Sequence, residues 1–562
     1  MPPSDHRSPV TDHPSPSRLP HIVRNVLVVA LSFGLAAAAG LVRNMVIAAQ
    51  FGIGADLDAY YAAFKLPDLL FTIVAGGALA TAFIPVFADF LAEEDRAGAW
   101  RLASAITNIV FIVVTASAVL AGILAPWLVR VLIAPGFSPA EQAQTVQVMR
   151  IVLLSTVIFG ISAVQGSVLN GFKHFLLPAL GAALYPVGIT LGALFLAPTM
   201  GIAGLAVGAV VGAALHLLVK VPGLFYYGFR WWPVLDLRGI HSLPVRRVFI
   251  LMGPRVLDLF VFQFSLIVTT NLASRLGAGS VSALEWGWDA MQLPETIIGT
   301  AFGLVAFPTL AELAARHDLG RLRSTLGETL RSVIALTLPA AAGLILLGQP
   351  LLSFLYQRGQ FDAAAVDAVY ATLRFFALGL VGHATLELAA RAFFAQQDTV
   401  TPLIVAVVTA LLGIGLGILL MQPLGAGGLA LGNSMAITVE VLLLMAILRR
   451  RWGGVEGWTI LRSLLRVALA TAIMALAVAA VLAWTQGRGY GALVQLLAGG
   501  AVGVLVYLAA GLLAALLLAV SATWMVARGF ARRIGGYTVQ AQAIADGDYE
   551  QPWPVTQVRE LD

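Results

Sequence analysis

The segment Gly201-Ile-Ala-Gly-Leu-Ala-Val-Gly208 returns 224 residues later as Gly425-Ala-Gly-Gly-Leu-Ala-Leu-Gly432. Other landmarks repeat at this spacing or within three residues of it: Leu177-Pro178 and Thr401-Pro402, Phe137 and Phe361, Phe51-Gly-Ile-Gly54 and Leu276-Gly-Ala-Gly279, and Leu66-Pro67 and Leu293-Pro294. One such match can arise by chance, but five matches in one register indicate a duplication. The sequence therefore predicts two copies of one fold within a single chain.

The composition is that of a membrane protein. Of the 562 residues, 59% are hydrophobic and 11% are charged, whereas a soluble globule carries about 25% charged residues. Long apolar runs predict about 14 membrane spans: 25–50, 59–92, 102–133, 147–171, 175–197, 201–222, 246–274, 283–312, 329–354, 366–393, 400–421, 425–448, 461–484 and 492–527. Each copy contains an even number of spans, so both copies insert the same way up. We expect an all-α polytopic membrane protein with two parallel six-helix repeats plus two extra helices.

Basic residues gather in the loops on one side of the predicted membrane. These loops carry Arg96, Arg101, Lys173, Arg230, Arg238, Arg246, Arg247, Arg316, Arg321, Arg323, Arg449, Arg450 and Arg451, whereas the opposite loops carry Arg275, Arg358 and Arg488. Because Lys and Arg accumulate in cytoplasmic loops, both termini are predicted to be cytosolic. We expect a disordered leader at 1–24, lobes at 25–222 and 246–448, an addition at 461–527, and a cytosolic tail at 528–562.

Nine charged residues lie in or beside stretches that are otherwise apolar: Arg43, Asp58, Lys65, Asp68, Arg255, Asp258, Glu285, Asp289 and Glu295. A charge near the bilayer interior is costly, so it normally faces a polar cavity on a transport path. The nine residues form two clusters, 43–68 and 255–295, in equivalent parts of the two copies. This arrangement predicts a substrate site between the lobes, with Asp58, Asp258, Glu285 and Asp289 as candidate gate or ion-pair residues.

Two prolines occupy equivalent positions beside these charges. Pro67 and Pro294 each remove a backbone hydrogen bond and disfavour helical geometry in the preceding residue. Inside a membrane, such a break is tolerated where the backbone faces a cavity or is satisfied by neighbouring groups. A plain structural kink is the alternative, but the paired placement favours two hinges that line the cavity.

The sequence offers no basis for catalysis. There is no cysteine, which excludes disulfides, thiol chemistry and Cys-ligated metals. No phosphate-binding loop, HExxH motif or nucleophile elbow occurs in a workable context. We expect no enzyme, cofactor, metal site or nucleic-acid partner, and an ion gradient or the membrane potential as the energy source.

Three other polar features inside apolar spans are expected to be structural. Glu387 and Arg391 are four residues apart, which favours a salt bridge on one helical face. His216 and His383 are single histidines, for which a packing role is favoured over a proton relay.

A set of motifs carries a family resemblance. In chain order they are Gly40-Leu-Val-Arg43, Phe51-Gly-Ile-Gly54, Asp58-Ala59, Ala63-Phe-Lys-Leu-Pro67, Ala134-Pro-Gly-Phe137, Met252-Gly-Pro254, Gln357-Arg-Gly-Gln-Phe361 and Gln397-Asp-Thr-Val-Thr-Pro402. Taken together, these motifs make roughly residues 25–520 similar to the MurJ/MviN family, the lipid II flippases of the MOP exporter superfamily. The family's plan of six, six and two spans also matches.

The resemblance implies a function and a site. The family moves undecaprenyl-pyrophosphate-linked disaccharide-pentapeptide from the inner to the outer leaflet of the bacterial cytoplasmic membrane, for peptidoglycan synthesis. It implies membrane lipids and cell-wall synthesis proteins as partners, and a groove for the lipid tail in the last two spans. It also implies Arg43, Lys65 and Arg255 as pyrophosphate contacts, with Asn44 and Asp68 beside them.

The chain departs from the family pattern at its cavity arginines. Ala37, Phe71 and Ala290 stand where the family usually has arginine, and Asn44 stands where it has an acid. The cavity is then less basic than the family's, and two alternatives stay open. One is another exporter of the superfamily, for a different polyprenyl-linked glycan or for a cationic drug. The other is a membrane regulator or sensor that does not transport.

The tail carries a second resemblance. Arg532-Arg-Ile534, Ala541-Gln-Ala-Ile-Ala-Asp-Gly-Asp548, Val555 and Arg559-Glu-Leu561 resemble the opening of a HAMP linker, although its usual proline is missing. An amphipathic cytosolic tail without a signalling role is the alternative interpretation.

Overall fold

The computed structural model describes residues 19–75, 77–232 and 243–545, and within these ranges all regular structure is helical. Thirteen helical segments of the described chain are long and apolar enough to cross a membrane. The remaining predicted span, 59–92, falls on two shorter helices. The first of them contains three acidic residues and a lysine, which lower its hydropathy.

The helices of the first copy, here the N-terminal repeat, are α1 (Leu19–Phe51), α2 (Ala55–Ala75), α3 (Gly77–Ala92), α4 (Arg96–Leu128), α5 (Pro139–Gly171), α6 (Leu176–Leu191), α7 (Ala197–Met200), α8 (Ile202–Leu218) and α9 (Val221–Tyr226). The C-terminal repeat consists of α10 (Leu243–Ala273), α11 (Ser280–Glu295), α12 (Ala301–Ala315), α13 (Leu319–Tyr356), α14 (Ala363–Ala395), α15 (Val400–Leu424) and α16 (Ala426–Trp452). Single π-helical turns follow α4 (Val129–Ile133), α6 (Gly192–Leu196) and α11 (Thr296–Thr300).

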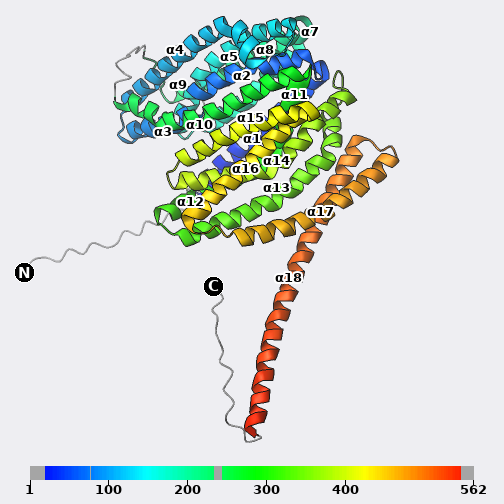
Figure 1. The fold of residues 1–562 in the computed structure, drawn as a ribbon. Helices are drawn as coiled ribbons and strands as arrows, with labels where there is room; N and C mark the ends of the chain where they lie inside the picture. Colours follow the sequence, from blue (N-terminus) through cyan, green and yellow to red (C-terminus); the bar gives the residue numbers. More distant parts are fainter. Residues whose placement is uncertain (1–18, 76, 233–242, 546–562) are drawn as a thin grey trace, which may run out of the picture. The chain divides into compact units, whose positions relative to one another are not determined.

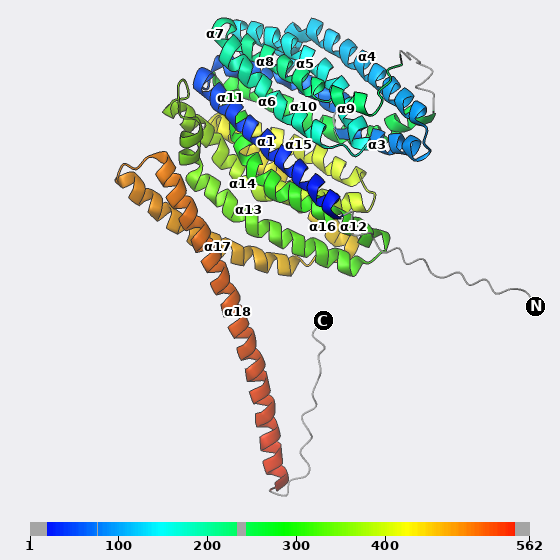
Figure 2. The same cartoon turned by 180° about the vertical axis from the view of Figure 1, so that it is seen from behind.

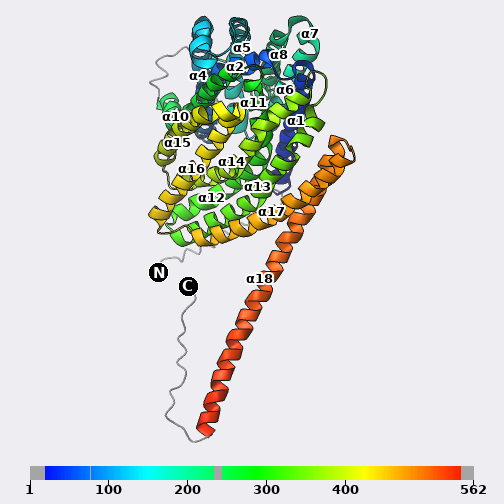
Figure 3. The same ribbon diagram turned by 45° about the vertical axis from the view of Figure 1, so that its right-hand side comes forward.

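The two repeats pack by one plan. In the N-terminal repeat α1 packs on α6, α2 on α5, α4 on α5, and α8 on both α5 and α6. The counterparts in the C-terminal repeat make the same contacts, with α10 on α15, α11 on α14, and α13, α14, α15 and α16 together. Figures 1 and 3 show α4, α5 and α8 in one bundle and α13, α14 and α16 in the other, and Figure 2 shows α1 beside α6.

The repeated glycine segment explains the close pairing of α6 with α8 and of α15 with α16. Gly201 and Gly425 begin the second helix of each pair, with φ of 59° and 57°. A Cβ added to Gly208 would lie 2.7 Å from the Cα of Gly192, and one added to Gly432 would lie 2.7 Å from the backbone nitrogen of Gly417. Small residues at such crossings let two membrane helices approach backbone to backbone.

Gly188→Ala should destabilise the fold, because its new Cβ would lie 2.2 Å from the Cα of Gly212 on α8. Overpacking of this kind typically costs about 1–3 kcal/mol. The matched control is Gly415→Ala on α15, where nothing lies within 4 Å of the added Cβ. Thermal unfolding in detergent should show a lower midpoint for the first variant and an unchanged or higher one for the second, because alanine favours helix. Equal midpoints would contradict this explanation of the crossing.

A polar cap closes the turn between α14 and α15. Asp398 accepts hydrogen bonds from the Thr401 nitrogen (2.9 Å) and the Thr401 hydroxyl (2.6 Å), and Arg451 of α16 contacts it at 2.6 Å. Partial burial raises the pKa of Asp398, but the bonds from Thr401 and Arg451 outweigh that effect and lower the pKa to about 2. The carboxylate therefore joins the start of α15 to the end of α16.

Asp398→Ala should cost about 1–2 kcal/mol, the usual loss for a helix cap. Because the folded-state pKa lies below the usual value of 3.8, the stabilisation is full above that value and is lost as the pH falls toward 2. The difference in unfolding midpoint between the two proteins should therefore stay constant from neutral pH to about pH 5 and shrink below it. A difference that grows on acidification would contradict this assignment.

The chain divides into two compact units, Met1–Gly457 and Trp458–Asp562. In the second unit, α17 (Gly457–Gly487) and α18 (Ala492–Ala545) form a helical hairpin. Gly503 lets α18 approach Val478 of α17 closely, since a Cβ added to Gly503 would lie 3.2 Å from a methyl carbon of Val478. At 1.5 Å per residue α18 is about 80 Å long, more than the ~30 Å of a hydrocarbon core. The helix thus continues past residue 528, where the tail was predicted to begin, and residues 546–562 of the HAMP-like motif lie outside the described chain.

Candidate substrate cavity and its closed end

Four loops from both repeats meet at one end of the first unit, here called the gate end: 52–54, 134–138, 274–279 and 357–362. The Gln360 nitrogen donates to the Ala49 carbonyl (2.9 Å), and the Gly136 nitrogen donates to the Ser274 hydroxyl (3.1 Å). Asn271 of α10 also donates to the Leu132 carbonyl (2.7 Å). These bonds tie the N-terminal repeat to the C-terminal repeat, so the bundle is closed at this end.

A buried carboxylate makes the strongest of these links. Asp58 of α2 is fully buried, and its two oxygens accept from the Gly279 nitrogen (2.6 Å), the Ser282 nitrogen (2.7 Å) and the Ser282 hydroxyl (2.6 Å). Gly279 occupies the N-cap position of α11 in a left-handed conformation and has no side chain to cap the helix. Asp58 therefore supplies, from the other repeat, the acceptor that the first turn of α11 needs.

A second link crosses the repeats one turn further along α11. Lys65 of α2 forms an ion pair with Glu285 of α11, and the two side chains are 9% and 26% exposed. Beside it, the indole nitrogen of Trp286 donates to the Tyr61 hydroxyl (2.7 Å). Because both charges are largely shielded from water, separating them without a substitute partner would be costly.

Arg43 of α1 lies in the same region. Its guanidinium donates twice to the Asn44 side-chain oxygen, at 3.0 and 2.8 Å, and Asn44 hydrogen-bonds to Tyr356 of α13. The charges of Arg43 and Lys65 both act on Asp289, which follows Glu285 by one helical turn. No carboxylate among the described residues forms an ion pair with Arg43 within 4 Å, so its charge is held next to an amide.

Five charged side chains thus form a central cluster: Arg43, Lys65, Asp68, Glu285 and Asp289. Asp68 is accessible to water-sized molecules although it lies deep within the protein, near Lys65 and Glu285. This combination is expected of a residue that faces a wet cavity. The described cluster contains three carboxylates and two cations, so it is not positively biased. The side chains of Arg255 and Asp258, both on α10, lie outside the described part of the structure.

The two predicted hinge prolines do not end their helices. Pro67 is buried inside α2, which continues to Ala75, and Pro294 lies one residue before the end of α11. A π-helical turn, Thr296–Thr300, follows Pro294 directly and joins α11 to α12. Such turns mark places where helical bonding is rearranged.

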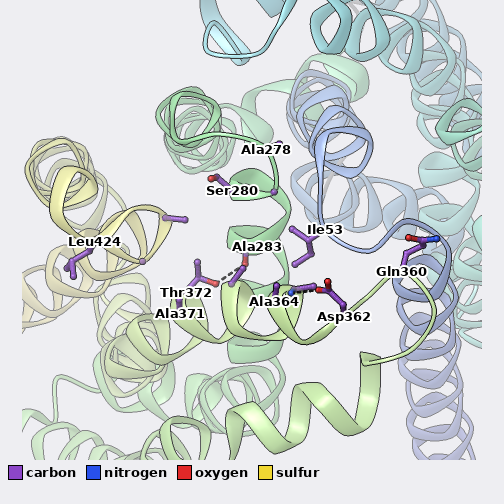
Figure 4. Close-up of a pocket in the computed structure, with 15 residues that line it drawn as sticks. Ile53, Ala278, Ser280, Ala283, Gln360, Asp362, Ala364, Ala371, Thr372 and Leu424 are labelled. Carbon is purple, nitrogen blue, oxygen red and sulfur yellow. Dashed lines mark hydrogen bonds between the residues drawn. The ribbon is translucent and has the colours of Figure 1, made fainter.

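A cavity of about 460 Å³ lies at the gate end, between Ile53 and the starts of α11 and α14 (Figure 4). Its wall is formed mostly by alanines and glycines. Two of its polar side chains are engaged: the Thr372 hydroxyl donates to the Ala283 carbonyl (2.8 Å), and Asp362 caps α14 through the Ala365 nitrogen (2.8 Å). This cavity therefore offers no free cation to an anionic head group, and it is distinct from the central cluster.

The sequence gives no indication of two residues that hydrogen-bond to α2 across the repeats. Ser282 and Trp286 are common residues in a helix, and only the arrangement of α2 against α11 reveals that they face Asp58 and Tyr61.

The predicted salt bridge between Glu387 and Arg391 is present at 2.8 Å. His383 hydrogen-bonds to Asn433 (3.2 Å).

Solved structures share this fold of two packed helical repeats with charged side chains between them. The structure of "Lipid II flippase MurJ, inward closed conformation" matches with a TM-score of 0.72 at 22% identity, over 86% of this chain and 98% of that one. An inward-facing MATE family multidrug transporter of the MOP superfamily matches with a TM-score of 0.65 at 14% identity, over 75% of this chain and 96% of that one.

Sequence comparison gives the family. The family model "Lipid II flippase MurJ" matches residues 47–500. The lipid II flippase MurJ of Burkholderia cenocepacia is 31% identical over 438 residues, which cover 77% of this chain and 84% of that protein. The probable lipid II flippase MurJ of Rhizobium meliloti is 30% identical over 456 residues, covering 79% and 84%. The chain belongs to the lipid II flippase MurJ family.

Asp58→Ala should open the gate end, because it leaves the Gly279 and Ser282 donors without an acceptor. Each lost bond to a charged group is worth about 1.5–3 kcal/mol. The chain has no native cysteine, so Ala283→Cys, at a position only 2% exposed, is a clean reporter for a membrane-impermeant thiol reagent. Labelling should rise several-fold with Asp58→Ala.

Asp56→Ala is the matched control, because Asp56 lies in the same turn of α2 but is exposed and accepts a hydrogen bond from the Gln144 side chain (2.7 Å). It should leave labelling unchanged. Equal labelling in the three proteins would show that the Asp58 cap does not hold the gate end closed.

Proposed function

We propose that the chain flips lipid II, the polyprenyl-pyrophosphate-linked peptidoglycan precursor, across the bacterial cytoplasmic membrane by alternating access. The observation that carries the proposal is the central cluster, to which both repeats contribute charges beside a closed gate end. Membership of the family supports lipid II as the substrate. With both termini in the cytosol, the gate end faces outward and the cluster is reached from the inner leaflet.

The packing of the helices supports a lateral route for the substrate. α10 lies along both α2 and α3, whereas its counterpart α1 makes no extended contact with α11 or α12 among the described residues. The repeats are therefore sealed on one side and less tightly joined on the other. A polar head group can enter through the looser side while its polyprenyl tail stays in the lipid, for which the hairpin of α17 and α18 is the candidate groove.

The Lys65–Glu285 pair suggests how binding drives the change of state. An anionic pyrophosphate that approaches Lys65 competes with Glu285, and Arg43 provides a second cation nearby. When the phosphate replaces the carboxylate, α2 loses one of its two charged links to α11, and the Asp58 cap remains as the last. Substrate binding thus weakens the outer closure, and Pro67 and the segment after Pro294 are the places where the helices would bend.

A second candidate function is export of a cationic small molecule. The excess of carboxylates in the described cluster favours it. A precedent within the fold is a solved MOP superfamily transporter from Pyrococcus furiosus, 14% identical with a TM-score of 0.56, for which the reverse polarity of the binding pocket suggests a different function. The third candidate is a regulator that binds the precursor at the same central cluster without moving it.

Complementation of a bacterium depleted of its lipid II flippase tests these proposals. The unmutated chain should restore growth, and Arg43→Ala should abolish the rescue because it removes the cation without a carboxylate partner. Arg316→Ala is a suitable control, since Arg316 is exposed at the end of α12 and forms an ion pair with Glu312, four residues earlier (2.6 Å). Failure of the well-expressed unmutated chain would favour export of a cation or regulation.

Exchanging the ion pair separates its structural role from substrate binding. Lys65→Glu alone should destabilise the fold, by a few kcal/mol for a broken buried pair. Combining it with Glu285→Lys restores an ion pair across the same helices, so the unfolding midpoint should recover most of the loss. Growth rescue should recover only weakly, because the cation now lies on α11 instead of α2. Full recovery of both would show that Lys65 serves structure alone.

A further inference from the structure

A buried amine lies outside the central cluster. Lys220, at the N-cap of α9 and two residues after α8, is 2% exposed, and its Nζ donates to the Ser162 carbonyl and the Ser162 hydroxyl of α5, both at 3.0 Å. The His216 ring lies beside it, with nitrogens 3.3 and 3.4 Å from the amine. The Ser162 hydroxyl is 2.8 Å from His216 Nδ1. The sequence favours packing for His216, whereas the structure joins it to a lysine and a serine.

We propose that Lys220, Ser162 and His216 form a proton-binding relay that couples proton movement to the transport proposed above. The proposal rests on that function for its role, but the site itself is defined by its own geometry. The amine donates to the hydroxyl, which has two acceptors in reach: His216 Nδ1 at 2.8 Å and the His216 carbonyl at 3.2 Å. In the relay the hydroxyl donates to Nδ1, so the three groups form a continuous chain of hydrogen bonds. His216 then carries its own proton on Nε2.

The proton balance of the relay is simple. The Lys220 ammonium passes a proton to the Ser162 oxygen as the hydroxyl proton moves to His216 Nδ1. The products are a neutral amine and an imidazolium, and the total charge stays at one. Because the two nitrogen groups lie within 3.4 Å in a buried site, both cannot be charged together without strong repulsion. The site therefore holds one proton, which it accepts from one side and releases to the other.

The surroundings isolate this proton. Among the described groups, α5 contributes only uncharged polar side chains to the amine: Ser162, and Gln165 one turn away, whose buried Oε1 has no hydrogen-bond partner. α8 contributes His216. α6 presents Gly181, where a Cβ would lie 3.2 Å from the lysine Cε, and α9 presents Tyr226 to the outside. No carboxylate among the described residues pairs with Lys220, so its charge depends on the proton alone.

One aromatic layer separates the relay from the central cluster. The Phe159 ring lies 5.0 Å from the His216 ring, 4.8 Å from the Tyr185 ring of α6 and 5.5 Å from the Phe71 ring of α2. Tyr185 in turn lies within the electrostatic reach of Asp68 and Arg43. A proton that arrives or leaves at His216 thus changes the field and the packing behind the α2 residues that face the substrate.

Reconstituted full-length protein tests the coupling. Liposomes with a pH dye inside are given a fluorescent lipid II analogue and, in separate arms, a pH gradient, a Na⁺ gradient or a K⁺ diffusion potential. For the unmutated chain, the pH gradient should raise the rate of glycan movement several-fold over its own gradient-free rate, with matching proton flux. This ratio should fall to about one in Lys220→Met and in His216→Asn, and should be kept in Lys173→Met.

Stimulation by Na⁺ alone, or proton coupling that survives Lys220→Met, would overturn the relay. If the unmutated chain moves no glycan in any arm, the proposed function fails, and a second measurement still decides the relay. The chain has three lysines, Lys65, Lys173 and Lys220, so lysine carrying ¹³C at Cε gives three signals that substitution assigns. Histidine carrying ¹⁵N in its ring gives the His216 signal, which His216→Asn assigns. The relay predicts that the Lys220 and His216 signals titrate as one coupled pair and that Ser162→Ala separates them. Independent titration in the unmutated chain would contradict it.

Discussion

At the closed end of this protein, a buried carboxylate makes the strongest link between the repeats, because it serves as the cap of a helix in the other repeat. A glycine at the N-cap of α11 leaves its first turn without a local acceptor, and Asp58 of α2 fills that position with both oxygens. A buried carboxylate is stable only where its oxygens are matched by donors, and a helix N-terminus provides several of them. Each element therefore needs the other, and the two repeats are held in one state.

The neighbouring Lys65–Glu285 pair adds a link of a different kind. The Asp58 cap consists of two backbone donors and the Ser282 hydroxyl, all buried, whereas the ion pair consists of side chains with which an anion can exchange. Under the proposed function, the first link sets the resting state, and the second makes it sensitive to the charge in the cavity. The family resemblance implies arginines at three other positions, where this chain has Ala37, Phe71 and Ala290. The proposed function therefore places more of this role on Lys65 and Arg43.

The sequence predicts the framework of this protein well, because the framework rests on local and periodic features. The glycines at 201–208 and 425–432 have one role in both copies, close helix crossing, and their spacing reveals the duplication. The apolar runs give the helices directly. The partners of the charges are a different matter: Asp58, Lys65 and Glu285 are recognisable as costly charges, but their contacts join residues more than 200 positions apart.

Two features escape prediction from the sequence for physical reasons. Lys220 lies at the end of a predicted span, where a lysine usually extends toward the interface, and only the packing of α5 against α8 encloses it. α18 continues without a break past the predicted membrane boundary, because nothing in its residues ends a helix there. For Lys220, local composition predicts an interfacial side chain, and tertiary packing buries it. For α18, hydropathy predicts where the apolar span ends, but it does not predict where the helix ends.

The most direct test of the central claim is the distance between spin labels across the gate end, with and without lipid II. Cysteines at the exposed positions Asp56 of α2 and Ala363 of α14 report on the gate end, and cysteines at Arg96 and Arg316 report on the opposite end. Substrate should lengthen the first distance and shorten the second, and it should have no such effect when Arg43 is alanine. Lipid II that binds while both distances stay unchanged would contradict the claim.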